Sequence, residues 1–387
     1  MTRRIYLDYN ATAPLRSEAA EAMRACQARG FGNASTPYQE GRAARHALQE
    51  ARQQLAIVLG AERDEILFTS GGTEANHLGL LAALLAARRQ RKAHVVTSAI
   101  EHASLLKMLT DSPLRELWSL DVAPVDHQAV TPVDGVLDRV RSDTALVVLQ
   151  LVNNEVGTIQ PVAALASALA ARGIPLLCDA VQALGKLDVD VRALGVSLLT
   201  LSAHKVGGPP GIGALYVRSG TPIAAPLVGG SQELGLRPGT EPVALAVGFA
   251  RAAQLASDDR QAEQARLEQL RALLCEELRA VGCVITAGTA VCVANTLHLV
   301  FPGLDAMALV AALDLQGIAI STGAACSTGA NLPSPVLNAI GSGAHARSAI
   351  RISMGRGTSA DDVLSCARTL ARTVRELRLH APRESRS

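Results

Sequence analysis

The chain has 387 residues, of which 49% are hydrophobic and 19% are charged, and this composition predicts a globular protein of about two domains rather than a disordered chain. The net charge is +2 and the Lys and Arg residues are spread along the chain, so we expect no nucleic-acid partner. No apolar run approaches the roughly 18 residues of a membrane span, the N-terminus lacks a secretory signal, and the seven cysteines form an odd set. These features predict a cytoplasmic protein with no membrane partner.

The N-terminal residues predict a short strand within 5–14, followed by a helix with Ser17 as its N-cap. A polar loop that contains Asn33 comes next, and then a helix over residues 41–59.

Residues 64–84, DEILFTSGGTEANHLGLLAAL, predict a strand, a Gly-Gly turn and a helix in close succession. Gly72 allows the backbone to approach a ligand, Thr73 offers a hydroxyl and free amides, and the positive end of the helix attracts a phosphate. Standing alone, this motif is explained about equally well by an ordinary strand-to-helix turn.

Three further strand-to-helix junctions carry polar residues at the carboxyl end of an apolar run, namely His102, Asn154, and Asp179 with Gln182. For any one of these residues, a satisfied hydrogen bond in a loop is the simpler explanation. Their repeated occurrence predicts a doubly wound α/β domain with its site at the carboxyl edge of a mostly parallel sheet.

The stretch 197–217, SLLTLSAHKVGGPPGIGALYV, predicts two buried strands separated by a Gly/Pro-rich loop. Lys205 lies where the first strand ends, beside Ser202 and His204, so we expect it to be partly desolvated. Desolvation lowers the pKa of a lysine and makes its amine available for a Schiff base. The alternative is a solvated loop lysine, the usual state of this residue type.

From residue 257 to residue 282 the sequence becomes polar and helix-favouring, and we interpret this helix as the bridge to a smaller α+β domain. The predicted large domain covers 15–256, and the predicted small domain combines 1–14 with 257–387. Ser334 followed by Pro335 predicts a helix start within the small domain.

Eight motifs together resemble the cysteine desulfurases, the NifS/IscS group of fold-type I pyridoxal-phosphate enzymes. In chain order they are LDYNATAP, FTSGGTEAN, NNEVG, DAVQ, SAHKVGGPPGIGALY, RPGTE, STGAACSTG and IRISMGR. The resemblance covers nearly the whole chain, from Tyr6 to about Gly357.

The resemblance implies a pyridoxal 5'-phosphate cofactor bound covalently by Lys205, and no metal. Asp179 would face the pyridine nitrogen, Gln182 the phenolic oxygen, and His102 would stack on the ring and carry protons. The remaining implied cofactor contacts are Asn154 near the ring, the phosphate-binding residues Gly72, Thr73, Ser202 and His204, and Thr240 from the other subunit of a homodimer.

The resemblance also implies that Arg351 binds the carboxylate of the L-cysteine substrate, with Asn33 near it. Cys326 matches the catalytic cysteine. Independently of the family, Cys326 is the only one of the seven cysteines set in a Gly/Ala/Ser/Thr loop, where a reactive thiol can move.

The implied function is removal of sulfur from L-cysteine to give L-alanine and a persulfide on Cys326, for iron-sulfur cluster assembly or thiolation through a sulfur-acceptor protein. A selenocysteine lyase and a non-catalytic cofactor-binding scaffold are the alternatives. Four positions depart from the common family pattern, Ala34, Tyr38, Pro210 and Leu234, and they leave the subgroup and the acceptor open.

Overall fold

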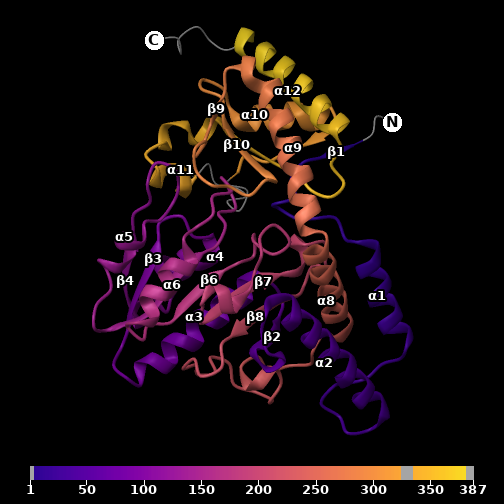
Figure 1. Ribbon diagram of the computed structural model, residues 1–387, viewed down its shortest axis with the longest axis vertical. Coiled ribbons are helices and arrows are strands. Elements are labelled where there is room, and N and C mark those ends of the chain that lie inside the picture. The colour runs from indigo at the N-terminus through magenta and orange to yellow at the C-terminus, as the bar shows by residue number, and fades with distance from the viewer. Residues whose placement is uncertain (1–3, 324–333, 381–387) are drawn as a thin grey trace.

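The computed structural model describes residues 4–323 and 334–380, and it has two parts, each with its own sheet and helices (Figure 1). The larger part is built on a seven-stranded sheet in the order β2-β8-β7-β6-β5-β3-β4. Every strand of this sheet is parallel to the others except β8, which pairs antiparallel with both β2 and β7. The predicted doubly wound, mostly parallel sheet is therefore confirmed.

The strands of this sheet are β2 (Ile66–Thr69), β3 (His94–Ser98), β4 (Ser119–Ala123), β5 (Thr144–Gln150), β6 (Leu176–Asp179), β7 (Leu198–Ser202) and β8 (Gly213–Val217). The helices around it are α1 (Ser17–Ala28), α2 (Gln39–Leu59), α3 (Gly72–Arg88), α4 (Ala103–Asp111), α5 (Val133–Leu137), α6 (Val162–Ala170), α7 (Val191–Leu194) and α8 (Val243–Asp258).

Apolar side chains cover both faces of the large sheet. Along β5, Val147 and Leu149 belong to a cluster with α2 and α8, whereas Leu146 and Val148 belong to a second cluster with α3 and α4. Successive residues of a strand point to opposite faces, so a strand that is covered on both faces needs apolar residues at consecutive positions, as residues 146–149 of β5 show.

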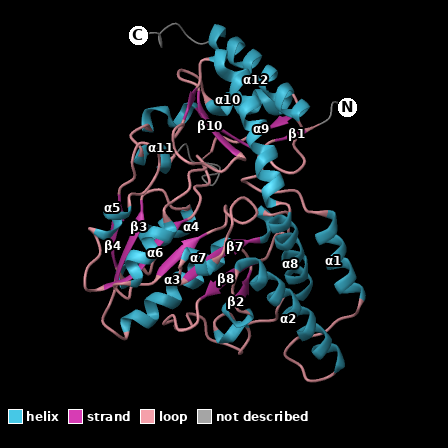
Figure 2. Cartoon of the chain, in the orientation of Figure 1, coloured by secondary structure: helices cyan, strands magenta, loops and turns pink. Residues whose placement is uncertain are grey.

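The smaller part contains a three-stranded antiparallel sheet, β12-β10-β9, and a short parallel pair, β1-β11 (Figure 2). Its strands are β1 (Ile5–Tyr6), β9 (Val284–Ile285), β10 (Thr296–Val300), β11 (Ile318–Ala319) and β12 (Ala349–Ser353). Its helices are α9 (Arg260–Leu278), α10 (Ala306–Leu315), α11 (Pro335–Ala339) and α12 (Ala360–His380). The N-terminal strand β1 thus joins the C-terminal part of the chain, and Leu7 packs in the same cluster as Leu270 and Leu309.

Two helix starts test the capping predictions. Ser334 is the N-cap of α11 and its hydroxyl accepts a hydrogen bond from the backbone N–H of Leu337 at 3.1 Å, as predicted. The prediction for Ser17 is wrong, because Arg16 is the N-cap of α1 and the Ser17 hydroxyl instead donates to Glu18.

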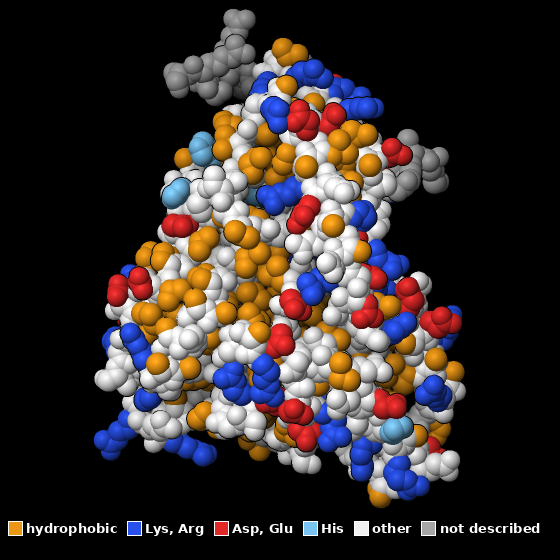
Figure 3. Space-filling view, viewed as in Figure 1, with side chains coloured by type: hydrophobic (Ala, Val, Ile, Leu, Met, Phe, Trp, Pro, Cys, Tyr) orange, Lys and Arg blue, Asp and Glu red, His pale blue; other side chains and the backbone are white. Residues whose placement is uncertain are grey.

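On the face drawn in Figure 3, basic and acidic side chains are interspersed over both parts of the molecule. No helix within the described ranges combines the length and the apolar character needed to cross a membrane.

A buried ion pair anchors the loop after β8 to α2. The guanidinium of Arg52 donates to both carboxylate oxygens of Glu233 at 2.7 Å, and one of these oxygens also accepts from the backbone N–H of Phe68 at 2.8 Å. The backbone of Glu233 and Leu234 has φ values of 47° and 57°, a left-handed conformation that costs about 1 kcal/mol or more per non-glycine residue. The ion pair therefore stabilises a strained turn.

We expect Arg52→Met to destabilise the fold by about 3–5 kcal/mol, because it leaves the Glu233 carboxylate buried without its counter-ion. Urea unfolding monitored by circular dichroism measures the effect. Arg63→Met is the matched control, since Arg63 pairs with Asp64 on the surface and its loss should leave the unfolding midpoint unchanged. Equal unfolding midpoints for the two variants would contradict this role of Arg52.

Candidate active site

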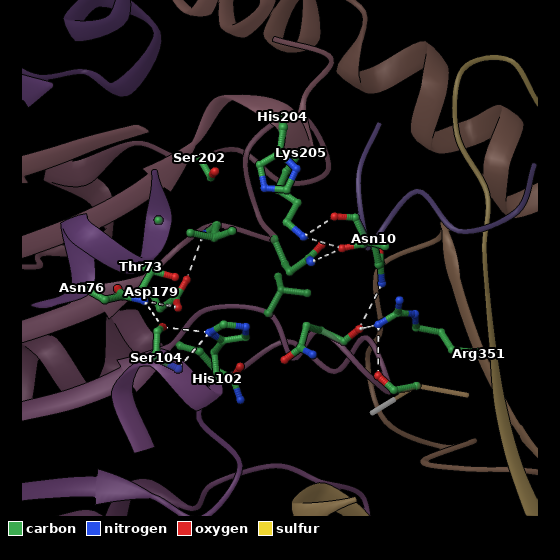
Figure 4. Close-up of a pocket in the computed structure, with 18 residues that line it drawn as sticks. Asn10, Thr73, Asn76, His102, Ser104, Asp179, Ser202, His204, Lys205 and Arg351 are labelled. Carbon is green, nitrogen blue, oxygen red and sulfur yellow. Dashed lines mark hydrogen bonds between the residues drawn. The ribbon is translucent and has the colours of Figure 1, made fainter. Parts of the chain in front are cut away.

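A pocket of about 350 Å³ lies at the carboxyl ends of β3, β5, β6 and β7, beside the point where the strand order reverses. Ten predicted site residues line it: Gly72, Thr73, His102, Asn154, Asp179, Gln182, Ser202, His204, Lys205 and Arg351. In Figure 4, Lys205 and His102 lie on opposite sides of the pocket, and Asp179 and Arg351 lie towards its two ends. Cys326 falls outside the described residues.

Lys205 sits in a short turn, Ala203–Lys205, that directly follows β7. Its amine donates to the backbone carbonyl oxygens of Asn10 at 2.6 Å and Ala11 at 2.8 Å. The N-terminal segment after β1 therefore fixes the position of the amine. The predicted placement of this lysine at a strand end is confirmed.

His204 precedes Lys205, and its ring nitrogen Nδ1 lies 3.1 Å from the Thr12 hydroxyl. Burial, together with the positive charge of Lys205, lowers the pKa of His204 to about 4. The imidazole is therefore neutral near neutral pH and adds no charge to the site.

A second lysine lies next to Lys205, and sequence reasoning missed it. Lys186 donates to the side-chain oxygens of Gln182 at 2.6 Å and of Asn10 at 3.0 Å. Desolvation, with the nearby charges of Lys205 and Arg351, lowers the pKa of Lys186 well below its usual value. Its position, four residues after Gln182 in ALGKL, gave no local sign that it hydrogen-bonds residues of the site.

Asp179 is the last residue of β6, and neutral donors orient its carboxylate. Oδ1 accepts from the backbone N–H of Val181 at 3.0 Å, and Oδ2 accepts from the Asn76 amide at 2.9 Å. Among the described residues no Lys, Arg or His forms an ion pair with it. Both of these hydrogen-bond donors are uncharged groups.

The N-terminus of α3 forms another wall of the pocket. The helix begins at Gly72 without a side-chain cap, and both Gly72 and Thr73 line the cavity. A Cβ atom on Gly72 would lie 2.7 Å from a methyl carbon of Val181, so only glycine fits there. An uncapped helix N-terminus of this length is suited to an anionic group such as phosphate.

The residues present fit pyridoxal phosphate. The amine of Lys205 suits its aldehyde, the carboxylate of Asp179 suits a protonated ring nitrogen, and the start of α3 suits its phosphate. These three features come from different elements and face one pocket, whose size is within the usual range for small-molecule sites.

Arg351 projects from β12 of the smaller sheet, and its guanidinium is almost fully engaged by the protein. It donates to the Asp8 carboxylate at 2.7 Å, to the Asn154 carbonyl at 2.8 Å and to the Gly323 carbonyl at 3.4 Å. Its Nε atom is buried without a partner. The sequence predicts that this guanidinium binds a substrate carboxylate. In the structure one of its nitrogens already donates to the Asp8 carboxylate.

Neither Asn33 nor Thr240 lines the pocket of its own chain. They lie on two linked surface loops, because the Gln232 amide donates to the Ser35 hydroxyl at 3.3 Å and its carbonyl oxygen accepts from the backbone N–H of Gly239 at 3.2 Å. The expectation that Asn33 lies near Arg351 stays a prediction. The expectation that Thr240 acts on the other subunit stays a prediction.

Sequence reasoning also missed Asn10, Asn76 and Ser104, all of which line the pocket. Asn10 and Asn76 occur inside the quoted motifs LDYNATAP and FTSGGTEAN, so the motifs marked the segments but not these side chains.

Comparisons with known proteins agree on one family. The profile of the aminotransferase class-V family matches residues 5–365. A cysteine desulfurase IscS of Dictyoglomus turgidum is 38% identical, over 99% of this chain and 97% of that protein. An IscS-like cysteine desulfurase of Mycobacterium tuberculosis is also 38% identical, over 96% and 97% of the two chains.

Solved structures also resemble this chain along nearly its whole length. A NifS-like protein superposes with a TM-score of 0.89 at 31% identity, covering 97% of this chain and 100% of the other. A structure of SspA in complex with cysteine gives a TM-score of 0.78 at 33% identity, covering 91% and 99%.

A buried histidine next to the site makes stability depend on pH. His298 lies opposite Arg351 in the β10-β12 ladder, with Nδ1 2.9 Å from the Thr286 hydroxyl and Nε2 without a partner. Burial, and then the charge of Arg351, lowers its pKa to about 3. Between its ordinary pKa near 6.5 and about 3 the unfolded chain binds a proton at this position and the folded chain does not, so folding weakens as the pH falls.

We therefore expect the free energy of unfolding to fall by up to about 1.4 kcal/mol per pH unit below pH 6.5 on account of His298. His298→Gln should flatten this part of the profile, measured as urea midpoints between about pH 7 and about pH 5. His46→Gln is the control, because His46 is exposed on α2, and it should keep the wild-type slope. A His298→Gln profile as steep as wild type would refute the assignment.

Proposed function

We infer that this chain, which belongs to the aminotransferase class-V family and to its cysteine desulfurases, removes the sulfur of L-cysteine and leaves L-alanine and a persulfide on Cys326. The observation that carries this proposal is the convergence of Lys205, Asp179 and Arg351 on one pocket from three separate elements. An amine, a carboxylate and a guanidinium are the groups needed to hold the cofactor and an amino-acid substrate.

Pyridoxal phosphate, when bound, supplies an electron sink for the carbanion left when a proton leaves the α-carbon of the substrate. Asp179 would present its carboxylate to the protonated ring nitrogen, and the start of α3 would hold the phosphate. Lys205 accepts the α-proton at Nζ, and the carbonyls of Asn10 and Ala11 orient that atom.

Arg351 attracts the carboxylate of the substrate. The Nε atom of Arg351 is a buried donor without a partner in the protein. The guanidinium nitrogen that donates to Asp8 becomes a further donor for the substrate when the Asp8 carboxylate is displaced. The relative SspA has been solved in complex with cysteine, which supports cysteine as the substrate here.

Cys326 completes the reaction. Its thiolate attacks the substrate sulfur, an S–S bond forms, the C–S bond of cysteine breaks, and the carbon takes up a proton, so that L-alanine and the Cys326 persulfide account for all atoms. Cys326 follows Gly323 by three residues, and Gly323 lines the pocket and contacts Arg351. The persulfide sulfur then passes to an acceptor protein, for iron-sulfur cluster assembly or thiolation.

The active form we propose is a homodimer. Arg237 pairs with Glu74 at 3.0 Å and the Arg52–Glu233 pair holds the same loop, so Thr240 is held away from its own pocket and exposed. The apolar side chains exposed on this loop, on the segment before it and on the Asn33 loop are Phe31, Tyr38, Leu227, Val228 and Leu234. Exposed apolar residues beside two site residues that miss their own pocket are consistent with an interface that serves the partner's site.

Two further proposals concern location and domain organisation. A reducing cytoplasm is supported by the six cysteines of the described residues, all of which are free thiols. The division into 15–256 and 1–14 with 257–387 is supported by the separate apolar clusters of the two parts.

Lys205→Ala should abolish the visible absorbance of lysine-bound pyridoxal phosphate, because alanine offers no amine. Absorbance spectra of the purified variant after incubation with the cofactor measure this loss. Lys107→Ala, which removes an exposed lysine of α4, should retain the wild-type spectrum. A wild-type spectrum from Lys205→Ala would show that another residue binds the cofactor.

Cys326→Ser tests the desulfurase function directly. The variant should bind the cofactor normally but release alanine from L-cysteine at least about 100-fold more slowly, because a serine hydroxyl stays protonated near neutral pH. Alanine release is measured by amino-acid analysis, and mass spectrometry of the wild type locates the added sulfur.

Cys26→Ser is the control, because Cys26 lies on α1 outside the pocket, and it should leave turnover unchanged. Wild-type turnover by Cys326→Ser, or an added sulfur on another cysteine, would disprove the function as assigned. Residual activity with selenocysteine alone would instead favour the lyase.

A further inference from the structure

Four polar side chains form a continuous hydrogen-bonded chain from the end of β6 to the start of α4. Asp179 accepts from Asn76, Asn76 contacts Ser104, and Ser104 contacts His102 (Figure 4). The successive distances are 2.9, 2.9 and 2.8 Å. The chain thus runs from the carboxylate assigned to the ring nitrogen of the cofactor to the histidine on the other side of the pocket.

The chemistry of the groups determines the direction of each bond. The amide nitrogen of Asn76 can only donate, and it donates to Asp179 Oδ2 and to Ser104 Oγ. The amide oxygen of Asn76 accepts from the Thr200 hydroxyl at 2.7 Å, which fixes the orientation of the buried amide. Ser104 Oγ therefore accepts from Asn76, and its own proton is left for His102.

His102 is the N-cap residue of α4, and its Nδ1 receives two donors. The Ser104 hydroxyl lies 2.8 Å from Nδ1, and the backbone N–H of Ser104 donates to the same atom at 3.2 Å. Because a backbone N–H cannot accept a hydrogen bond, Nδ1 must present its lone pair. The proton of the neutral ring is then on Nε2.

We propose that Ser104 and Asn76 are positioning residues that hold His102 as the neutral tautomer protonated on Nε2. Figure 4 places the ring edge that carries Nε2 on the pocket side, away from Ser104. His102 therefore meets the substrate as a hydrogen-bond donor, and returning to the other tautomer would place a ring N–H against the backbone N–H of Ser104.

Asn76 also connects the two ends of this row of hydrogen bonds, Asp179 and His102. One amide nitrogen serves both Asp179 and Ser104, so the carboxylate and the imidazole are positioned by the same buried residue on α3. The use of this arrangement in turnover rests on the proposed desulfurase function, whereas the tautomer itself is a property of the folded chain.

The test uses the cofactor-loaded protein labelled with ¹⁵N-histidine. Two-bond ¹H–¹⁵N correlation spectra distinguish the two neutral tautomers, and the spectrum of His102→Gln identifies the His102 signals. We expect the wild type to show Nε2 protonated. Ser104→Ala removes the shorter of the two contacts to Nδ1 and leaves the backbone donor at 3.2 Å. It should therefore raise the Nδ1-protonated population and lower kcat roughly tenfold with little change in KM.

Ser104→Thr restores the hydroxyl and should restore the wild-type tautomer and kcat. Ser112→Ala is the matched control, because Ser112 caps the other end of α4 and its hydroxyl contacts only the Leu114 backbone in the described structure. If His102 of the wild type is protonated on Nδ1, the proposal is wrong. The proposal is also wrong if Ser104→Ala leaves the His102 tautomer unchanged. A fixed Nε2 tautomer in a protein that does not act on cysteine would uphold the proposal and refute the proposed function.

Discussion

The active site depends on one residue of the N-terminal segment, Asn10, whose backbone and side chain are fully used. Its carbonyl oxygen accepts from Lys205 and Gln182, and its side-chain oxygen accepts from Lys186 and Asn295. Its amide group donates to Thr296 of β10 and to the Asn154 carbonyl, and its backbone N–H donates to Ser353 of β12. The residue therefore ties the lysine-bearing loop of the large sheet to two strands of the small one, which explains why a segment near the N-terminus must return to the C-terminal part of the chain.

The second constraint is an excess of positive charge around this residue. Lys186, Lys205 and Arg351 lie close enough for their charges to interact, and within the described part of the pocket only Asp8 forms an ion pair with one of them. Burial and the neighbouring positive charges lower the pKa of Lys186 well below its usual value, which reduces the cost of placing a second lysine beside Lys205. The remaining positive charge makes the pocket favourable for anions. The phosphate of the cofactor and the carboxylate of an amino acid are both anions.

Sequence patterns predicted the elements that present the site better than the contacts inside it. The carboxyl ends of predicted strands locate Thr73, His102, Asp179 and Lys205, because each strand end is a local feature and the strands of a parallel sheet bring their carboxyl ends to one edge. The bond between Asn76 and Ser104 joins residues 28 positions apart on different helices, and no local pattern encodes it. The misassigned cap at Ser17 has the same origin, since the path of the chain before α1 is set by a backbone contact between Arg16 and Gly207.

Arg351 shows how packing can change the chemistry that a motif suggests. Its strand partner His298 is neutral because of burial and the arginine charge, while Glu155, also buried, has a raised pKa and accepts from the Ser334 hydroxyl at 2.5 Å. Asp8 is the carboxylate that forms an ion pair with the guanidinium. Under the proposed function, a substrate carboxylate that displaces Asp8 would exchange one charged partner for another, so the arginine would keep a counter-ion and binding would avoid most of that desolvation cost. The ion pair with Asp8 thus supplies the counter-ion that the buried guanidinium requires.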